Sequence, residues 1–185
     1  YRARRQRQMC IRDSHYHILH GFNKVLEIND YQIKNKEREG IVYAGTFADW
    51  VDYQLLEEIC AKFKNRNVYL VGKPAKNVSY DFLKNIEKRH ENLEVLYPMN
   101  KSELHKFLIN CAVAIIPYKS NLLHIRNCSP SKIMDYLGCG LPIISSDIPY
   151  CKNHSYVTIA ETNKLFLKEI NNGFKTVSYT HLRAH

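Results

Sequence analysis

The sequence lacks several features that would assign it to a common class. It has no run of apolar residues near the ~18 to 20 that a membrane-spanning helix requires, and its arginine-rich beginning lacks the apolar core of a secretory signal peptide. It contains neither a G-x-x-x-x-G-K-[ST] phosphate loop nor a G-x-G-x-x-G motif, which disfavours P-loop and nicotinamide-dependent enzymes. What remains is a globular domain whose ligand must be inferred from other residues.

Cysteine spacing gives no support for a metal site. The six cysteines stand singly, without C-x-x-C spacing or a histidine cluster, whereas zinc sites use such groupings. Cys60 and Cys111 lie in apolar segments, which is typical of small buried side chains in a reducing cytoplasm. We therefore expect a cytoplasmic protein with no metal site. The nine histidines are expected to be mostly solvated or to belong to the ends of the chain.

The positive charge of the chain is concentrated at its ends. The 185 residues have a formal net charge of +9, with 45% hydrophobic and 24% charged residues. Residues 1–14 hold five arginines and one aspartate, and Arg183 lies near the other end, so the interior carries an ordinary +4. We therefore expect no nucleic-acid partner.

The two ends also look foreign to the rest of the sequence. Residues 1–14 and 177–185 have no hydrophobic period and no capping residue, and they resemble translated sequencing-adapter read-through. We expect them to be non-native flanks and leave them out of the fold prediction. The competing interpretations of the first segment are a basic RNA-binding arm and a targeting peptide.

Between these ends, short apolar strands alternate with amphipathic helices. This alternation predicts a doubly wound, parallel, Rossmann-like α/β sheet, because βαβ units bring successive strands together in parallel. The expected strands are 41–47, 67–72, 93–97, 112–117, 142–146 and 156–160, and the expected helices are 52–64, 81–90, 102–110 (with Ser102 as its cap), 129–137 and 162–170.

Ligands of such sheets bind beyond the carboxyl ends of the strands. The residues found there are 45–47, 72–74, 98–100, 118–120 and 127–131. Within the last segment, Ser129-Pro130 predicts a helix start that would direct free N–H groups at an anion. Lys132 opposes the helix dipole unless an anion is bound, and Asp135 lies one turn further on the same face. The alternative is a solvated i,i+3 pair of Lys132 and Asp135.

Residues 129–146, S-P-S-K-I-M-D-Y-L-G-C-G-L-P-I-I-S-S, resemble the P-x-K…E-Y-L-A-x-G-x-P-V-V signature of the "group 1" retaining GT-B glycosyltransferases, found especially among bacterial surface-polysaccharide enzymes. Residues 43–52 resemble the opening of their donor domain, 68–72 its second strand, and 93–117 its third and fourth strands. Residues 18–23 resemble the interdomain linker. The resemblance covers roughly residues 16–170.

The resemblance implies two Rossmann-like domains facing each other across a cleft, of which this chain holds the C-terminal one. Residues 15–39 would be the end of the N-terminal domain and the linker, and residues 40–170 the nucleotide-sugar-binding domain. Residues 171–185 would be its truncated end and a non-native flank. The catalytic residues are expected in the missing N-terminal domain, so the fragment alone is expected to be inactive.

The resemblance also implies roles for single residues. Asp135 stands where relatives carry the ribose-binding Glu, and Asn127 where many carry a Glu near the donor sugar. The loss of charge at Asn127 leaves the identity of the sugar open. The residues implied to contact the phosphates are Gly45, Thr46, Ser129, Ser131 and Lys132. Many relatives carry an Arg and a Lys where this chain has Asp49 and Asp52, so Lys73 and Lys119 are expected as further cations. The residues expected to contact the base are Met99 and Asn100. His124 is expected to be an ordinary loop residue, with a contact to the donor sugar as the alternative. Trp50, Tyr53, Tyr80 and Tyr136 are expected to be packing residues.

The function implied is transfer of a sugar from a UDP- or GDP-sugar to a glycan or lipid-linked acceptor, with retention of configuration. No cofactor beyond this co-substrate is implied. The full enzyme is expected in the cytoplasm, either free or peripherally associated with the inner face of the membrane. Two alternatives remain: half of a GT-B-fold sugar-nucleotide epimerase, and a non-enzymatic flavodoxin-like binding domain.

Overall fold

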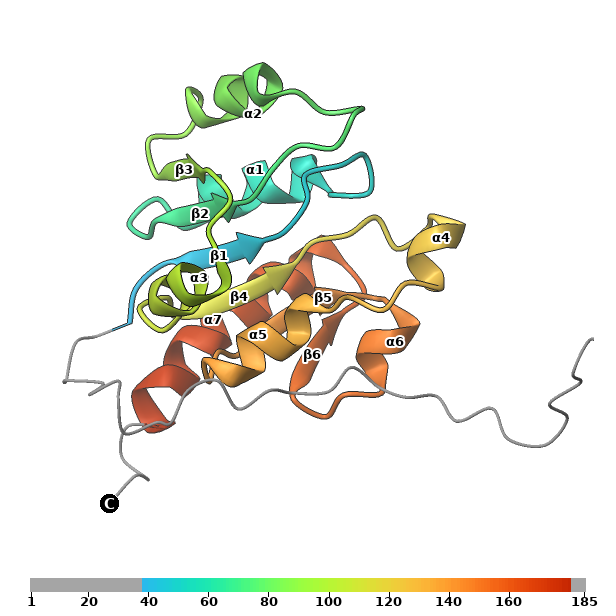
Figure 1. The fold of residues 1–185 in the computed structure, drawn as a ribbon. Helices are drawn as coiled ribbons and strands as arrows, with labels where there is room; N and C mark the ends of the chain where they lie inside the picture. Colours follow the sequence, from blue (N-terminus) through green and yellow to red (C-terminus); the bar gives the residue numbers. More distant parts are fainter. Residues whose placement is uncertain (1–37, 181–185) are drawn as a thin grey trace, which may run out of the picture.

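The computed structural model describes residues 38–180 and confirms the predicted doubly wound, parallel, Rossmann-like sheet (Figure 1). All strand pairs are parallel, and the order across the sheet is β3-β2-β1-β4-β5-β6. The strands are β1 (Ile41–Ala44), β2 (Val68–Val71), β3 (Leu93–Leu96), β4 (Val113–Ile116), β5 (Ile143–Ser146) and β6 (Val157–Ala160).

The burial of each strand explains why the sequence forms this sheet. The four residues of β1, of β4 and of β5 are all buried, as expected for central strands covered on both faces. The edge strands β3 and β6 expose part of their residues. The apolar runs that marked the strands in the sequence therefore form the core of the molecule.

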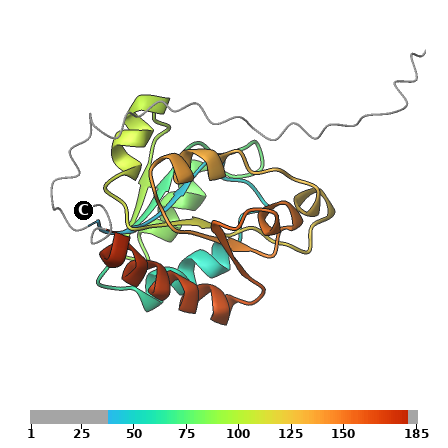
Figure 2. The ribbon, with the colours of Figure 1, turned by 90° about the horizontal axis from the view of Figure 1, so that it is seen from below.

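Helices cover both faces of the sheet. α1 and α7 lie on one face and α3 and α5 on the other (Figure 2). The helices are α1 (Tyr53–Lys62), α2 (Tyr80–Glu87), α3 (Lys101–Leu108), α4 (Leu123–Arg126), α5 (Lys132–Gly138), α6 (Pro149–Lys152) and α7 (Asn163–Thr180). The four-residue helices α4 and α6 were not expected, and α7 continues ten residues beyond the predicted end at residue 170.

Two predicted helix starts are wrong. The cap of α3 is Asn100, not Ser102: its side chain accepts a hydrogen bond from the backbone N–H of Glu103, whose carboxylate in turn accepts one from Asn100 (both 3.0 Å). α5 begins at Lys132 rather than near Ser129, and no side-chain hydrogen bond caps it. The backbone at Ser131 is already helical, so the chain enters α5 through a tight turn rather than through a capped end.

The loops that follow β1 and β2 touch each other closely. A Cβ atom on Gly72 would lie 1.9 Å from the carbonyl oxygen of Gly45, so only glycine fits at position 72. On the other side of β1, the hydroxyl of Tyr136 in α5 accepts a 2.7 Å hydrogen bond from the backbone N–H of Ala44. Both contacts fix the carboxyl end of β1.

The segment entering β1 is anchored to the same domain. The Arg38 guanidinium donates to the carbonyl oxygens of Cys139 and Gly140 (3.1 and 3.0 Å), just after α5. Residues 1–14 and 181–185 of the expected flanks and residues 15–37 of the expected linker lie outside the described residues. Residues 177–180, expected as part of the second flank, form the end of α7. Within residues 38–180, no helix is both long and apolar enough to span a membrane.

Candidate functional site

A cavity of about 480 Å³ lies at the carboxyl ends of β1 and β4, the two strands between which the strand order reverses. This is the place where doubly wound sheets bind ligands. The cavity is lined by Ala44, Gly45, Thr46, Trp50, Leu104, Tyr118, His124, Ile125, Cys128, Ser129, Pro130, Ser131, Lys132 and Asp135. The lining comes from the loops after β1 and β4, from α3, and from α4 and α5 with the segment between them.

Lys132, at the start of α5, holds its ammonium group against aromatic rings. The Nζ atom lies 4.1 Å from the ring centre of Tyr43 and 4.8 Å from that of Tyr118, and it donates a 2.5 Å hydrogen bond to the Tyr118 hydroxyl. Gly45 leaves the space for it, since a Cβ atom there would come within 2.6 Å of Nζ. Burial lowers the pKa of Lys132 to about 7.

The groups around this ammonium carry no negative charge near neutral pH. Burial raises the pKa of Tyr118 to about 12 and that of Tyr43 well above its usual value, so both hydroxyls stay protonated. Among residues 38–180, no ion pair joins Lys132 to a carboxylate. Lys132 therefore has a pKa near neutrality and no carboxylate partner within residues 38–180, and a bound anion would stabilise its protonated form.

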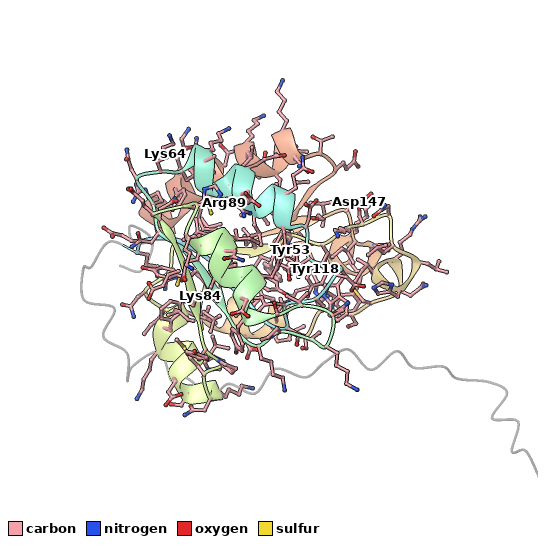
Figure 3. All side chains as sticks on the ribbon, turned by 90° about the horizontal axis from the view of Figure 1, so that it is seen from above. Tyr53, Lys64, Lys84, Arg89, Tyr118 and Asp147 are labelled. Carbon is pink, nitrogen blue, oxygen red and sulfur yellow. The ribbon has the colours of Figure 1, made fainter. Side chains whose placement is uncertain are left out.

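The Tyr118 side chain that supports Lys132 comes from the interior of the fold. In the view from above, Tyr118 lies near the middle of the molecule, whereas Lys64 lies at its margin (Figure 3). Lys64 is exposed, as are Lys73 and Lys119, the two further cations predicted for phosphate binding. Neither Lys73 nor Lys119 lines the cavity, so the structure leaves Lys132 as the only lysine among its lining residues.

Asp135, one turn after Lys132, also lines the cavity. Its Oδ1 atom lies 3.0 Å from Nε2 of His105 and 3.9 Å from Nζ of Lys101, both on α3. The solvated pair of Lys132 and Asp135 that the sequence left open is not formed among the described residues. The two side chains instead have separate partners and share one cavity.

His105 was missed by the sequence prediction, which treated the histidines as mostly solvated. It is only 6% exposed, although it is a polar residue on a surface helix. A signal was present, because His105 lies three residues before the buried Leu108 and so shares its apolar face. The sequence does not show that α3 and α5 pack so that Asp135 faces His105.

The structure brings together six of the predicted contact residues: Gly45, Thr46, Ser129, Ser131, Lys132 and Asp135. It does not place Asn127 with them; the Asn127 amide donates 3.1 Å to the carbonyl oxygen of Leu123 and is exposed. Met99 packs against the core, and the Asn100 side chain is occupied by the helix cap described above. The predicted base contacts are therefore not part of the cavity.

Two residues expected to have ordinary roles line the cavity as well. The rings of Trp50 and His124 meet edge to face with centroids 5.9 Å apart and form one wall. The backbone of Trp50 is held in place, since its carbonyl oxygen accepts a 2.8 Å hydrogen bond from the backbone N–H of Lys119. The cavity thus combines an aromatic wall, an unpaired cation and a carboxylate. Residues 38–180 contain no group of three or more metal-binding side chains.

No model of a known protein family matches the sequence, and no curated protein sequence matches it. The fold is similar to those of several solved structures. HepE from Anabaena, solved in complex with UDP-glucose, has a TM-score of 0.59 at 14% identity, over 76% of this chain and 40% of that chain. TarM has a TM-score of 0.55 at 12% identity, over 77% of this chain and 29% of that chain.

The apo-form glycosyltransferase GlyE of Streptococcus pneumoniae has a TM-score of 0.51 at 15% identity, over 74% of this chain and 33% of that chain. At identities this low, the likeness shows that the fold is shared. The chain spans 29% to 40% of the length of these three structures.

Proposed function

We propose that this chain is the donor-binding domain of a GT-B glycosyltransferase, which binds a nucleoside diphosphate sugar of the UDP or GDP type. The observation that carries the proposal is the pair of Lys132 and Asp135, which face one cavity at the reversal of the strand order. An unpaired buried cation suits a diphosphate, and a carboxylate one turn away suits the hydroxyl groups of a ribose.

The likeness to solved structures supports the same ligand class. HepE was solved with UDP-glucose, and GlyE is a glycosyltransferase. These ligands and activities belong to those proteins, and their transfer to this chain is a proposal. The proposal agrees with the position of the cavity at the reversal of the strand order, where doubly wound folds bind nucleotides.

We assign the parts of the ligand from the charges around the cavity. The diphosphate would lie against Lys132 and the backbone of Gly45 and Thr46. The ribose would lie against Asp135. The donor sugar would then extend toward the wall of Trp50 and His124, because aromatic rings offer an apolar face to the carbon side of a sugar.

In the proposed reaction, the sugar passes to a glycan or lipid-linked acceptor with retention of configuration. The part played by this domain is electrostatic: Lys132 would stabilise the negative charge that develops on the leaving diphosphate. The acceptor site and the catalytic residues would lie in a second Rossmann-like domain, as the family resemblance implies, and this chain spans 29% to 40% of the length of the three solved structures. We therefore expect no transferase activity from this chain alone, and we place the full enzyme in the cytoplasm at the inner face of the membrane.

Titration of the full 185-residue chain with UDP and with GDP tests the proposal. Trp50 is the only tryptophan, so its fluorescence reports on this cavity, and calorimetry gives the dissociation constant. We expect one of the two nucleotides to bind with a Kd below 1 mM, and Asp135→Ala to weaken it about tenfold, the usual cost of losing a charged hydrogen-bond acceptor.

Asp49→Ala is the matched control, since Asp49 is exposed and lies outside the cavity lining. It should leave the Kd unchanged. If neither nucleotide binds below the millimolar range, or if Asp135→Ala and Asp49→Ala behave alike, the donor-binding proposal is wrong. Either result would favour a binding domain of another class.

A further inference from the structure

The carboxylate proposed to hold the ribose is itself held by a buried histidine. Asp135 lies on α5 and His105 on α3, two helices that cover the same face of the sheet (Figure 2). Nε2 of His105 and Oδ1 of Asp135 are 3.0 Å apart. We infer that His105 is a positioning residue, which orients Asp135 so that its second oxygen, Oδ2, faces the ribose hydroxyls. This inference rests on the proposed function.

The hydrogen bonding of the imidazole indicates which nitrogen carries the proton. Nδ1 of His105 is buried and has no hydrogen-bond partner among the described residues, whereas Nε2 faces the carboxylate. A proton on Nε2 allows the ring to donate to Oδ1 of Asp135 and leaves Nδ1 as an unprotonated acceptor. This arrangement engages Oδ1 of Asp135 and leaves Oδ2 without a protein partner among residues 38–180.

Burial makes the histidine the more rigid of the two partners of Asp135. The side chain of His105 is 7% exposed, whereas that of Lys101, whose ammonium lies 3.9 Å from the same oxygen, is 62% exposed. An exposed lysine gives little geometric control, because its flexible chain and hydrated charge tolerate many positions. The orientation of the carboxylate therefore depends on His105.

Packing alone does not require a histidine at this position. The neighbouring buried position of α3 is Leu108, and a leucine at position 105 would fill a similar space without leaving a buried nitrogen unpaired. A buried polar atom without a partner is unfavourable, so its presence points to a role for the rest of the ring. That role is the hydrogen bond to Asp135.

The test compares each nucleotide with an analogue that lacks both ribose hydroxyls, on the full chain. The probes are UDP and 2′,3′-dideoxy-UDP, or GDP and its dideoxy analogue if GDP binds more tightly. For the unmodified chain we expect the dideoxy analogue to bind about tenfold more weakly, the cost of hydrogen bonds to a charged group. His105→Leu should bring this ratio of dissociation constants close to one, and His105→Gln, whose amide can still donate to Asp135, should restore most of it.

A matched control exists elsewhere in the chain. His90 forms a similar pair with Glu57, at 3.3 Å between Nε2 and Oε2, and neither residue lines the cavity. His90→Leu should leave the ratio unchanged. A purely structural role for His105 would weaken both probes equally in His105→Leu and keep the ratio, which would overturn the inference.

The outcomes also separate the inference from the proposal on which it rests. If the unmodified chain binds neither nucleotide, the proposed function fails. If it binds them and discriminates against the dideoxy analogue, but His105→Leu and His105→Gln discriminate equally well, only the positioning role fails. Should His105→Leu not fold, a His105→Gln chain that folds and loses the discrimination refutes the predicted rescue.

Discussion

Lys132 carries a charge that the folded protein holds at a cost, and its replacement by methionine measures this cost. Methionine has a similar length and an apolar end, so Lys132→Met keeps the contacts with Tyr43 and Tyr118 while removing the buried ammonium. We expect the variant to be more stable than the unmodified chain near neutral pH and to lose nucleotide binding. Such an exchange of stability for function is common at binding sites.

The structure gives a magnitude for the expected increase in the free energy of unfolding of Lys132→Met. Burial lowers the pKa of Lys132 from 10.5 to about 7, which corresponds to about 5 kcal/mol of destabilisation at pH 7 or below. Methionine also gives up two cation–ring contacts, each worth roughly 1 kcal/mol, and a hydrogen bond worth about 1 kcal/mol. Lys132→Met should therefore raise the free energy of unfolding by roughly 2 kcal/mol at pH 6.

The lowered pKa of Lys132 also determines how the stability difference between the two chains changes with pH. Between pH 7 and pH 10.5 the unfolded lysine holds its proton while the folded one has released it, so the unfolded state binds more protons and the unmodified chain gains stability as the pH rises. The advantage of Lys132→Met should be largest at pH 7 and below and should shrink steadily toward pH 10.

Urea unfolding followed by circular dichroism at pH 6, 8 and 9.5 measures these differences. Lys119→Met, at an exposed lysine outside the cavity lining, is the control and should show no such trend and unchanged UDP binding. An advantage that does not fall with pH, or a Lys132→Met chain less stable than the unmodified one at pH 6, would refute the reasoning.

Three further substitutions test other contacts by the same unfolding measurement, with UDP titration beside it. Tyr136→Phe leaves the buried N–H of Ala44 without its acceptor and should cost about 1–3 kcal/mol of stability. Asn100→Ala removes a helix cap and should cost about 1 kcal/mol with UDP affinity unchanged; a loss of affinity would instead support its predicted contact with the base. Gly72→Ala forces a methyl group into the carbonyl oxygen of Gly45 and should destabilise the fold by more than 2 kcal/mol; a smaller loss would show that the two loops can separate.

The sequence predicts the fold well because its signal is local. The central strands β1 and β4 are continuous apolar runs, and every expected strand appears in the structure within three residues of its expected bounds. The helix start expected at Ser129 was wrong for a local reason too: a serine before a proline is compatible with a cap, but here the chain continues through a turn before α5 begins.

The candidate site was predictable only in part. The glycine, serine, lysine and aspartate positions of the cavity follow from the end of each strand and from one sequence motif. The surroundings of Lys132 do not follow in this way, because Tyr43 comes from β1 and Tyr118 from the loop after β4, and the order of the sheet brings both to Lys132. The contact of His105 with Asp135 depends in the same way on how α3 and α5 pack.

The two proposed recognition groups belong to one short helix, and this has a consequence for selectivity. Three residues of α-helix advance about 4.5 Å along the axis, so the backbone of α5 sets the spacing between Lys132 and Asp135. Tyr136, the residue after Asp135, hydrogen-bonds this helix to β1. The helix therefore holds the two groups at a fixed spacing, which would suit a ligand whose negative group and diol have the same separation. Free phosphate or a free sugar would contact only one of the two groups, so we expect both to bind more weakly.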